Sequence, residues 1–268
     1  MPGSATRATF LDAGRQAEFE RNGFVVTDLL DARALARLRD GYRALDHRHS
    51  RDSPFAEGFH TTLYDTRPSY RRAVADLFAE ILDSALDQVL DRHRSFFANF
   101  AVKLPAGGAV PDHLDWSFVD ETRFRSATVW CPLEPTDAEN GALGVMVGSQ
   151  HRVDFIRAVN DRDFEQYGEL AASTGRRKVV PLAAGRAIVM DNRVVHFSPP
   201  NRLDSPRVVA ACVVAPVEAA LHHYWIDPDD QMLCFELDPA FYHSYVVGRP
   251  PADAEGVLGV HAMGPGGG

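Results

Sequence analysis

The chain has 268 residues, of which 45% are hydrophobic and 24% are charged, an ordinary composition for a globular protein with a large core. Acidic residues (37) outnumber basic ones (28), and the formal net charge of −9 argues against nucleic acid or an anionic membrane as a partner. We find no signal-peptide pattern and no apolar run of the roughly 20 residues that a membrane span needs.

The N-terminal third predicts helices that brace a sheet from outside. Residues 16–45 show the pattern helix, short strand, helix, and a third helix is expected over about 69–90, where apolar residues recur on one face. We therefore expect residues of about 13–93 to form a helical support. The irregular stretch 46–68 between these helices is a candidate lid, since long patternless loops in enzymes are often functional.

From about residue 96 the pattern changes to short β-rich runs separated by Gly, Pro, Asn and Asp. Many short strands at such intervals predict a sandwich or small barrel. A helical insert is expected at about 161–172, and the glycine-rich tail 264–268 should be disordered. Without internal repeats, the chain reads as one domain with a β core at about 96–226. The predicted strands cover residues 96–104, 127–133, 179–182, 187–190, 194–197 and 208–215.

The cysteines indicate a reducing compartment. Cys131, Cys212 and Cys234 show no Cys-x-x-Cys spacing, and the first two lie in predicted strands. Buried, reduced thiols are the expected state, and a cytoplasmic location follows as a prediction.

Two segments about eighty residues apart carry a candidate metal site, His113-Leu114-Asp115 and His196. Side chains two apart on a strand point to the same face, so His113 and Asp115 can converge on one ion. His196 closes an apolar run and lies at a predicted strand end. Two imidazoles and one carboxylate suit Fe(II), and also Mn(II), Co(II) or Zn(II). A His-x-Asp alone is common, and its bland interpretation is two polar residues near a turn.

Arg207 follows His196 by eleven positions and begins the next apolar strand. Residues 199–206 (PPNRLDSP) predict a hairpin connection, so that the return strand would run beside the strand of His196 and point Arg207 into the same interior. A buried cation needs a carboxylate partner, and a dicarboxylate co-substrate such as 2-oxoglutarate supplies one. Ser198 could donate its hydroxyl to the same carboxylate. An alternative role for Arg207 is a surface salt bridge with Asp204, and Arg202 competes for the role of anchor.

These residues, in this order, resemble the phytanoyl-CoA dioxygenase family, and the likeness spans residues 20 to about 215. One block departs from the family pattern, because Val147 stands where the family has proline and a glutamine is inserted before His151. The last fifty residues match no motif. The blocks that carry the resemblance are 20–30 (ERNGFVVTDLL), 103–108, 129–133, 139–143, 148–151, 185–196 and 200–202.

The resemblance implies a mainly β fold with flanking helices and a double-stranded β-helix (jelly-roll, cupin-like) core. It also implies an Fe(II) centre with 2-oxoglutarate and O2 as co-substrates. The reaction would hydroxylate an unactivated C–H bond of a small molecule in a biosynthetic pathway, with release of succinate and CO2. Asp115 disfavours the halogenating relatives, in which a small residue replaces this carboxylate. Desaturation, cyclisation and epimerisation stay open as outcomes.

Further side chains near these motifs are candidates for binding. Lys103, Thr128 and Trp130 are candidates for contact with the co-substrate, against the alternatives of a solvated lysine and of core packing. The substrate candidates, each with a core, turn or loop position as its alternative, are Trp116, Phe118, Asn192 and His60.

Two other functions are compatible with the sequence. The first is a non-catalytic module of the same fold that binds metal and 2-oxoglutarate. The second is a Zn(II)-dependent hydrolase, in which Arg207 would have no role.

Overall fold

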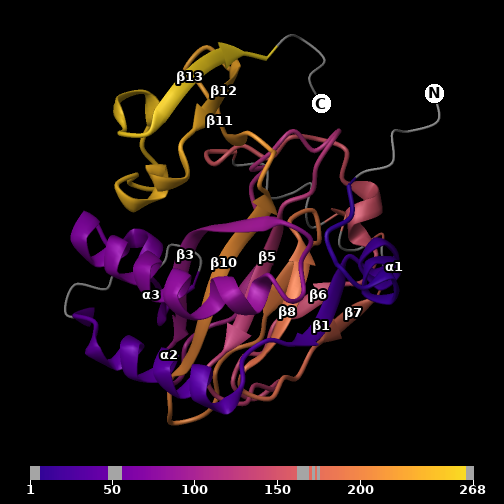
Figure 1. Ribbon diagram of the computed structural model, residues 1–268, viewed down its shortest axis with the longest axis vertical. Helices are drawn as coiled ribbons and strands as arrows, with labels where there is room; N and C mark the ends of the chain where they lie inside the picture. Colours follow the sequence, from indigo (N-terminus) through magenta and orange to yellow (C-terminus); the bar gives the residue numbers. More distant parts are fainter. Residues whose placement is uncertain (1–6, 48–55, 162–168, 171–172, 174–175, 264–268) are drawn as a thin grey trace.

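A computed structural model describes residues 7–47, 56–161, 169–170, 173 and 176–263. The chain forms three antiparallel sheets flanked by a few helices, the predicted mainly β architecture (Figure 1). In the part of the chain that the structure describes, short 3-10 helices join these elements, namely η2 (Thr62–Tyr64), η3 (Ser149–Arg152), η4 (Pro239–His243) and η5 (Pro251–Asp253).

Three α-helices lie in the N-terminal part, α1 (Ala13–Asn22), α2 (Ala32–Ala44) and α3 (Pro68–Leu86). The side chain of Asp31 caps α2 by accepting a hydrogen bond from the Ala34 backbone N–H at 2.7 Å, which satisfies one of the unpaired donors of the first turn. The third helix ends four residues before the predicted boundary.

The largest sheet has six strands in the order β1-β8-β5-β10-β3-β2. Two of them come from the N-terminal part, which was expected to lie wholly outside the β core, so that prediction was incomplete. Extended segments of five and three residues are too short to be recognised as core strands from periodicity alone. The strands are β1 (Phe24–Asp28), β2 (Phe59–Thr61), β3 (His93–Lys103), β5 (Ala127–Pro132), β8 (Arg186–Asp191) and β10 (Arg207–Pro216).

All ten residues of β10 are buried because this strand is covered on both faces. Val208 and Ala210 pack with Leu38 of α2 and Phe78 of α3 in one core. Val209, the residue between them, belongs to a second core on the opposite face of the sheet. Alternating side chains on one strand therefore serve two cores, one under the helices and one inside the β structure.

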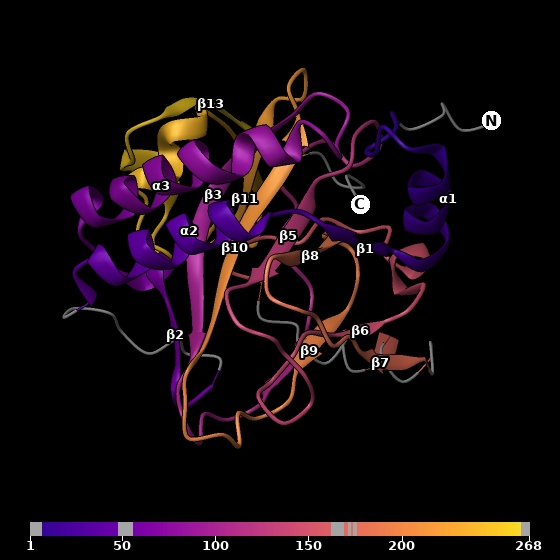
Figure 2. The same ribbon diagram turned by 60° about the horizontal axis from the view of Figure 1, so that its bottom comes forward.

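A second sheet, in the order β4-β9-β6-β7, lies on the face of the large sheet away from α2 and α3 (Figure 2). The two sheets enclose the second core and form the jelly-roll. The predicted hairpin between the strands of His196 and Arg207 is wrong, because these two strands belong to different sheets. The small sheet consists of β4 (Val110–His113), β6 (Gly144–Met146), β7 (Arg177–Val179) and β9 (His196–Ser198).

A third sheet stands beyond the end of β10 (yellow in Figure 1) and is formed by β11 (Leu221–Ile226), β12 (Met232–Leu237) and β13 (Val257–Ala262). Residues 221–226 were expected to belong to the β core, and their place in this separate sheet corrects that boundary. The predicted insert at 161–172 and the tail 264–268 fall wholly or mainly outside the described residues.

The cysteines Cys131, Cys212 and Cys234 are free and buried, as predicted. Burial raises the pKa of the Cys131 thiol to about 12, so this thiol stays protonated. Within the described part of the chain, no helix has the length and apolar character needed to cross a membrane.

Candidate metal centre and anion site

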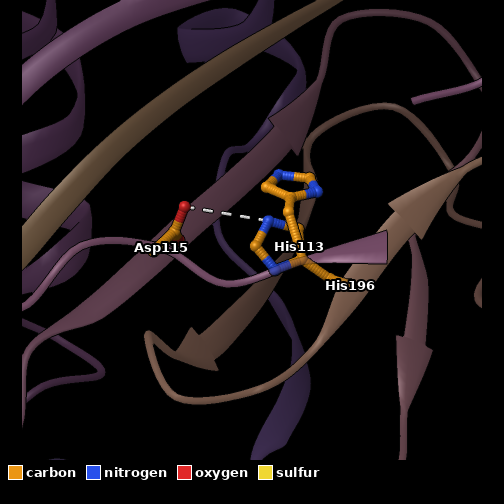
Figure 3. A group of neighbouring side chains, drawn as sticks. All are labelled: His113, Asp115 and His196. Atoms are coloured by element: carbon orange, nitrogen blue, oxygen red, sulfur yellow. Dashed lines mark ion pairs between the residues drawn. The ribbon is translucent and has the colours of Figure 1, made fainter. Parts of the chain in front are cut away.

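His113, Asp115 and His196 converge between the two sheets (Figure 3). His113 ends β4 and lies directly opposite His196, the first residue of β9, in the antiparallel register. One ligand atom from each of the three residues lies within 4.8 Å of the others. Nε2 of His196 lies 3.7 Å from Oδ1 of Asp115, and the two imidazole centroids are 4.0 Å apart. The arrangement offers two nitrogens and one oxygen to a single ion.

Both imidazoles are oriented by the backbone. Nδ1 of His113 lies 2.8 Å from the carbonyl oxygen of Pro111, and Nδ1 of His196 lies 3.0 Å from that of Val194. A carbonyl accepts, so each Nδ1 carries the proton and Nε2 is the nitrogen suited to a metal. Burial, and secondarily the neighbouring His196, lower the pKa of His113 to about 4, which keeps its ring neutral at pH 7.

Asp115 follows β4 and is fixed from two sides. The hydroxyl of Thr128 donates to Oδ2 at 2.5 Å, which leaves Oδ1 on the side of His196. Nε of Arg157 donates to the backbone oxygen of Asp115 at 2.8 Å, and its Nη1 donates to Glu121 at 2.9 Å. Leu114, between the two ligands, is buried in an apolar cluster.

The three residues line a cavity of about 370 Å³. Its walls are mainly apolar and aromatic, with side chains from both sheets and from the segment that follows Asp115. Cavities with such walls and a few convergent polar groups are the usual form of a small-molecule site. The aromatic residues of the wall include Phe59, Phe97, Trp116, Phe118 and Trp130.

Arg207 lies in the wall of the same cavity, at the start of β10 in the large sheet. The residue is 3% exposed, and its guanidinium carbon lies 5.4 Å from the centre of the Trp130 ring. Its Nε and Nη1 have no hydrogen-bond partner among the described residues, and no ion pair with Asp204 occurs there. Burial lowers the pKa of Arg207 to about 9. A buried guanidinium with unused donors fits an anionic ligand, because a carboxylate would restore both its hydrogen bonds and its charge balance.

Ser198 and Lys103 lie next to this cation. Ser198 lines the cavity, whereas Lys103 is fully buried behind it and is not part of the wall. Nζ of Lys103 donates to Oγ of Ser198 at 2.5 Å and to the carbonyl oxygen of Pro199 at 2.5 Å. Oγ of Ser198 accepts a hydrogen bond from Lys103, so the hydroxyl proton of Ser198 points in another direction. The hydroxyl can therefore donate a hydrogen bond to a ligand in the cavity.

The other predicted binding residues divide into two groups. Thr128, Trp130, Trp116 and Phe118 line the cavity, but Asn192 and His60 do not. The neighbours of His60 on β2, Phe59 and Thr61, face the cavity, so alternation along the strand turns His60 to the other side. Asn192 is fully buried, and its Oδ1 lies 3.3 Å from the Thr128 hydroxyl that holds Asp115.

Sequence reasoning missed Arg157, which fixes the backbone of Asp115 from 42 positions along the chain. It also missed Val247, a wall residue. Neither position lies in a motif or in a periodic segment, so no local pattern could have identified them. Arg202, the rival anchor, is exposed on a loop and pairs with Glu139 at 3.5 Å.

The family model for phytanoyl-CoA dioxygenase (PhyH) matches residues 19–209. A comparison with curated protein sequences gave no match.

Solved structures share the fold at low sequence identity. The 2-oxoglutarate-dependent carbocyclase SnoK from nogalamycin biosynthesis is 18% identical, with a TM-score of 0.59 over 79% of this chain and 86% of its own. HygX from Streptomyces hygroscopicus, with nickel, 2-oxoglutarate and hygromycin B bound, is 14% identical, with a TM-score of 0.56 over 78% of this chain and 88% of its own. EctD from S. alaskensis with bound Fe is 22% identical, with a TM-score of 0.56 over 83% of this chain and 84% of its own.

Proposed function

Because the chain belongs to the phytanoyl-CoA dioxygenase family, we propose that it is an Fe(II)- and 2-oxoglutarate-dependent dioxygenase. Its reaction is the hydroxylation of an unactivated C–H bond of a small molecule, with release of succinate and CO2. One observation carries the proposal. The buried guanidinium of Arg207, with donors that no described residue accepts from, lies in the same cavity as the His113, Asp115 and His196 cluster.

In this proposal Nε2 of His113, Nε2 of His196 and Oδ1 of Asp115 hold the iron. Backbone carbonyls keep both histidines in the tautomer that a metal requires, and Thr128 occupies the second oxygen of Asp115. Two nitrogens and one oxygen are a ligand set that would suit a ferrous ion. The ligands are positioned before the metal arrives, which favours binding because little reorganisation is needed.

Arg207 and Ser198 bind the distal carboxylate of 2-oxoglutarate. The planar guanidinium donates two parallel hydrogen bonds to a carboxylate, which a lysine cannot do. Ser198 adds a third donor because its oxygen is already occupied by Lys103. Trp130 covers the guanidinium and keeps water from competing for it.

When bound, iron with 2-oxoglutarate and oxygen supplies the oxidising power that an unactivated C–H bond requires. The protein would orient the reacting groups and exclude water from the cavity. Its apolar wall would exclude water from the reacting centre, and His113, Asp115 and His196 would hold the iron in the same cavity as the substrate.

A small-molecule substrate agrees with the neighbours, since one is solved with hygromycin B and another belongs to nogalamycin biosynthesis. The neighbours also include an epimerase and a carbocyclase, so the fold supports more than one outcome. Incorporation of isotopically labelled O2 into the product distinguishes hydroxylation from these reactions.

The test of the proposal is succinate formation from 2-oxoglutarate by protein loaded with Fe(II) under oxygen, compared between wild type and His113→Ala. Binding of 2-oxoglutarate is measured separately, under anaerobic conditions, by the visible charge-transfer absorption of its iron chelate. A loaded wild-type protein that neither binds nor decarboxylates 2-oxoglutarate contradicts the proposal. Binding without succinate, across a broad substrate panel, would instead support the non-catalytic module.

A further inference from the structure

The family match ends at residue 209, and the sheet of β11, β12 and β13 lies beyond it. This sheet is attached to the cavity through β11. The backbone N–H of His222 donates to the carbonyl of Phe118 at 2.8 Å, and the N–H of Val159 donates to the carbonyl of Tyr224 at 3.0 Å. Phe118 and Val159 both line the cavity. One strand of the C-terminal sheet thus holds two segments of the cavity wall.

Aromatic packing makes a second connection. The ring of Tyr242, in η4, lies 4.4 Å from that of Phe97 and 6.1 Å from that of Phe118. Phe97 lies in turn 5.5 Å from Trp116, the residue that follows Asp115. Tyr242 also contacts His223, whose Nδ1 lies 3.3 Å from the tyrosine hydroxyl. The wall rings Phe97, Trp116 and Phe118 therefore rest on a residue of the C-terminal segment.

Val247, in the loop that follows η4, reaches the cavity directly. This loop is tied to the body of the protein, because the guanidinium of Arg71, on α3, donates to the backbone oxygen of Tyr245. Val246, the neighbour of Val247, does not belong to the wall.

The charges around the cavity restrict what it can bind. Among the described residues that line it, Arg207 is the one arginine or lysine, and the acidic groups are Asp115 and Asp161. The proposed co-substrate takes Arg207 and the iron takes Asp115. No further cation of the described wall is available for a phosphate or carboxylate of a substrate. Flat aromatic faces, in contrast, favour a ring that stacks in an offset or edge-to-face arrangement.

We propose that the C-terminal segment, residues 221–262, determines which substrate enters this cavity, and that the substrate is a neutral, mainly apolar, ring-containing molecule. The inference rests on the proposed function, since it assigns the space beside the iron to a substrate. Tyr242 acts as a positioning residue, because it works through the wall rings, and Val247 contacts the substrate.

Binding of probes that share one ring system and differ in charge tests the proposal. Protein loaded anaerobically with Fe(II) and 2-oxoglutarate is titrated in a calorimeter with 1-naphthol, 1-naphthoate, 1-naphthylmethylammonium and octanoyl-coenzyme A. We expect 1-naphthol to bind about tenfold more tightly than either charged naphthyl compound. The described wall has no second cation for a carboxylate, and Asp161, the remaining acidic group, already has an interaction partner of its own. Absence of 1-naphthol binding, or equal or tighter binding of any charged probe, would overturn the proposal.

Variants of the C-terminal segment then locate the determinant. Val247→Trp puts a bulky indole into the cavity and should abolish 1-naphthol binding, whereas Val246→Trp, the matched control, should retain it. Tyr242→Ala should weaken binding about tenfold and Tyr242→Phe should restore it, because the ring and not the hydroxyl packs on Phe97. If Val247→Trp binds 1-naphthol as wild type does, the C-terminal segment is not the determinant, whatever the fate of the Tyr242 variants.

Failure of this inference is distinguishable from failure of the proposed function. The anaerobic charge-transfer absorption reports 2-oxoglutarate binding without any probe. A wild-type protein that shows no such absorption contradicts the proposed function. A protein that shows it but does not discriminate among the naphthyl probes contradicts only the inference on substrate class.

Discussion

Arg207 lies directly opposite Lys103 where β10 pairs with β3, so two buried cations are neighbours on the inner face of the large sheet. Burial, and then the charge of Arg207, lower the pKa of Lys103 to about 7. Three oxygens accept from its ammonium group, two of Ser198 and one of Pro199. Repulsion between the two cations favours the binding of an anionic group, such as a carboxylate, at Arg207.

The first prediction concerns Arg207. Arg207→Ala should weaken 2-oxoglutarate binding about a hundredfold, because the distal carboxylate would be buried without its charged partner. Arg207→Lys should recover part of the affinity, since a lysine keeps the charge but loses the planar fork. The dissociation constant is measured from the charge-transfer absorption of the anaerobic iron chelate.

The matched control for Arg207 is Arg202→Ala. Arg202 lies in the same connection but is exposed and pairs with Glu139 on the surface. The Arg202→Ala variant should therefore bind 2-oxoglutarate with the affinity of the wild type. If Arg202→Ala loses as much affinity for 2-oxoglutarate as Arg207→Ala does, Arg207 is not the specific anchor of the co-substrate.

The second prediction concerns Thr128. Thr128→Val keeps the shape of the side chain but removes the hydrogen bond to Oδ2 of Asp115, so Fe(II) affinity should fall about tenfold to a hundredfold. Thr128→Ser should retain most of the affinity. The control is Thr136→Val, a buried threonine whose hydroxyl has no hydrogen-bond partner among the described residues. Metal titration of all three variants decides whether the hydroxyl of Thr128 supports the carboxylate; equal affinity in Thr128→Val and wild type means that it does not.

The third prediction is a pH dependence of stability. The pKa of Lys103 is lowered from 10.5 to about 7, so above pH 7 the unfolded chain binds more protons at this residue than the folded one. The free energy of unfolding of the ligand-free protein should therefore gain a contribution that rises from pH 7 toward pH 9, by about 1 kcal/mol per pH unit. Below pH 7 lysine is charged in both states and this contribution is constant.

Denaturant titrations at several pH values test this dependence. Lys103→Met should flatten the rise, and Lys178→Met, which changes an exposed lysine on β7, should leave it intact. An unchanged slope in Lys103→Met would show that other groups carry it.

The fourth prediction concerns packing between β6 and β9. A Cβ on Gly144 would lie 2.3 Å from the ring of Phe197, its partner in the register. Phe197 is also held on its other side by the guanidinium of Arg177, 3.8 Å from the ring centre. Gly144→Ala should cost about 1–3 kcal/mol of stability through overpacking, as thermal or chemical unfolding would measure. Gly259→Ala, on β13 with open space around it, should cost far less. Equal losses would exclude contact with Phe197 as the cause.

Much of the fold could be predicted from local patterns. Helices, most strands of the large sheet and the buried cysteines follow from periodicity and turn signals, which short-range sterics determine. The His-x-Asp spacing and His196 identified side chains that the structure does bring together. Their coordination of iron stays a prediction until metal binding is measured.

Strand pairing over long distances could not be predicted in the same way. Proximity of β9 and β10 along the chain suggested a hairpin, but β10 crosses to the other sheet and pairs with β3 and β5. Arg207 reaches the predicted cavity nevertheless, by facing His196 from the opposite layer. The contributions of Arg157 and of the C-terminal segment depend on contacts between residues 42 and 145 positions apart, which leave no periodic signal.

His113 and His196, two of the three proposed metal ligands, belong to the small sheet, and Arg207, the proposed anchor of the co-substrate, belongs to the large one. A molecule of 2-oxoglutarate that reached both would add a second polar link between the two layers, besides the hydrogen bonds from Lys103 on β3 to Ser198 on β9. Its arrival would resist sliding of one layer over the other, and amide hydrogen exchange would slow on β9 and β10 together. In such a site the bound co-substrate would also stabilise the contact between the two sheets.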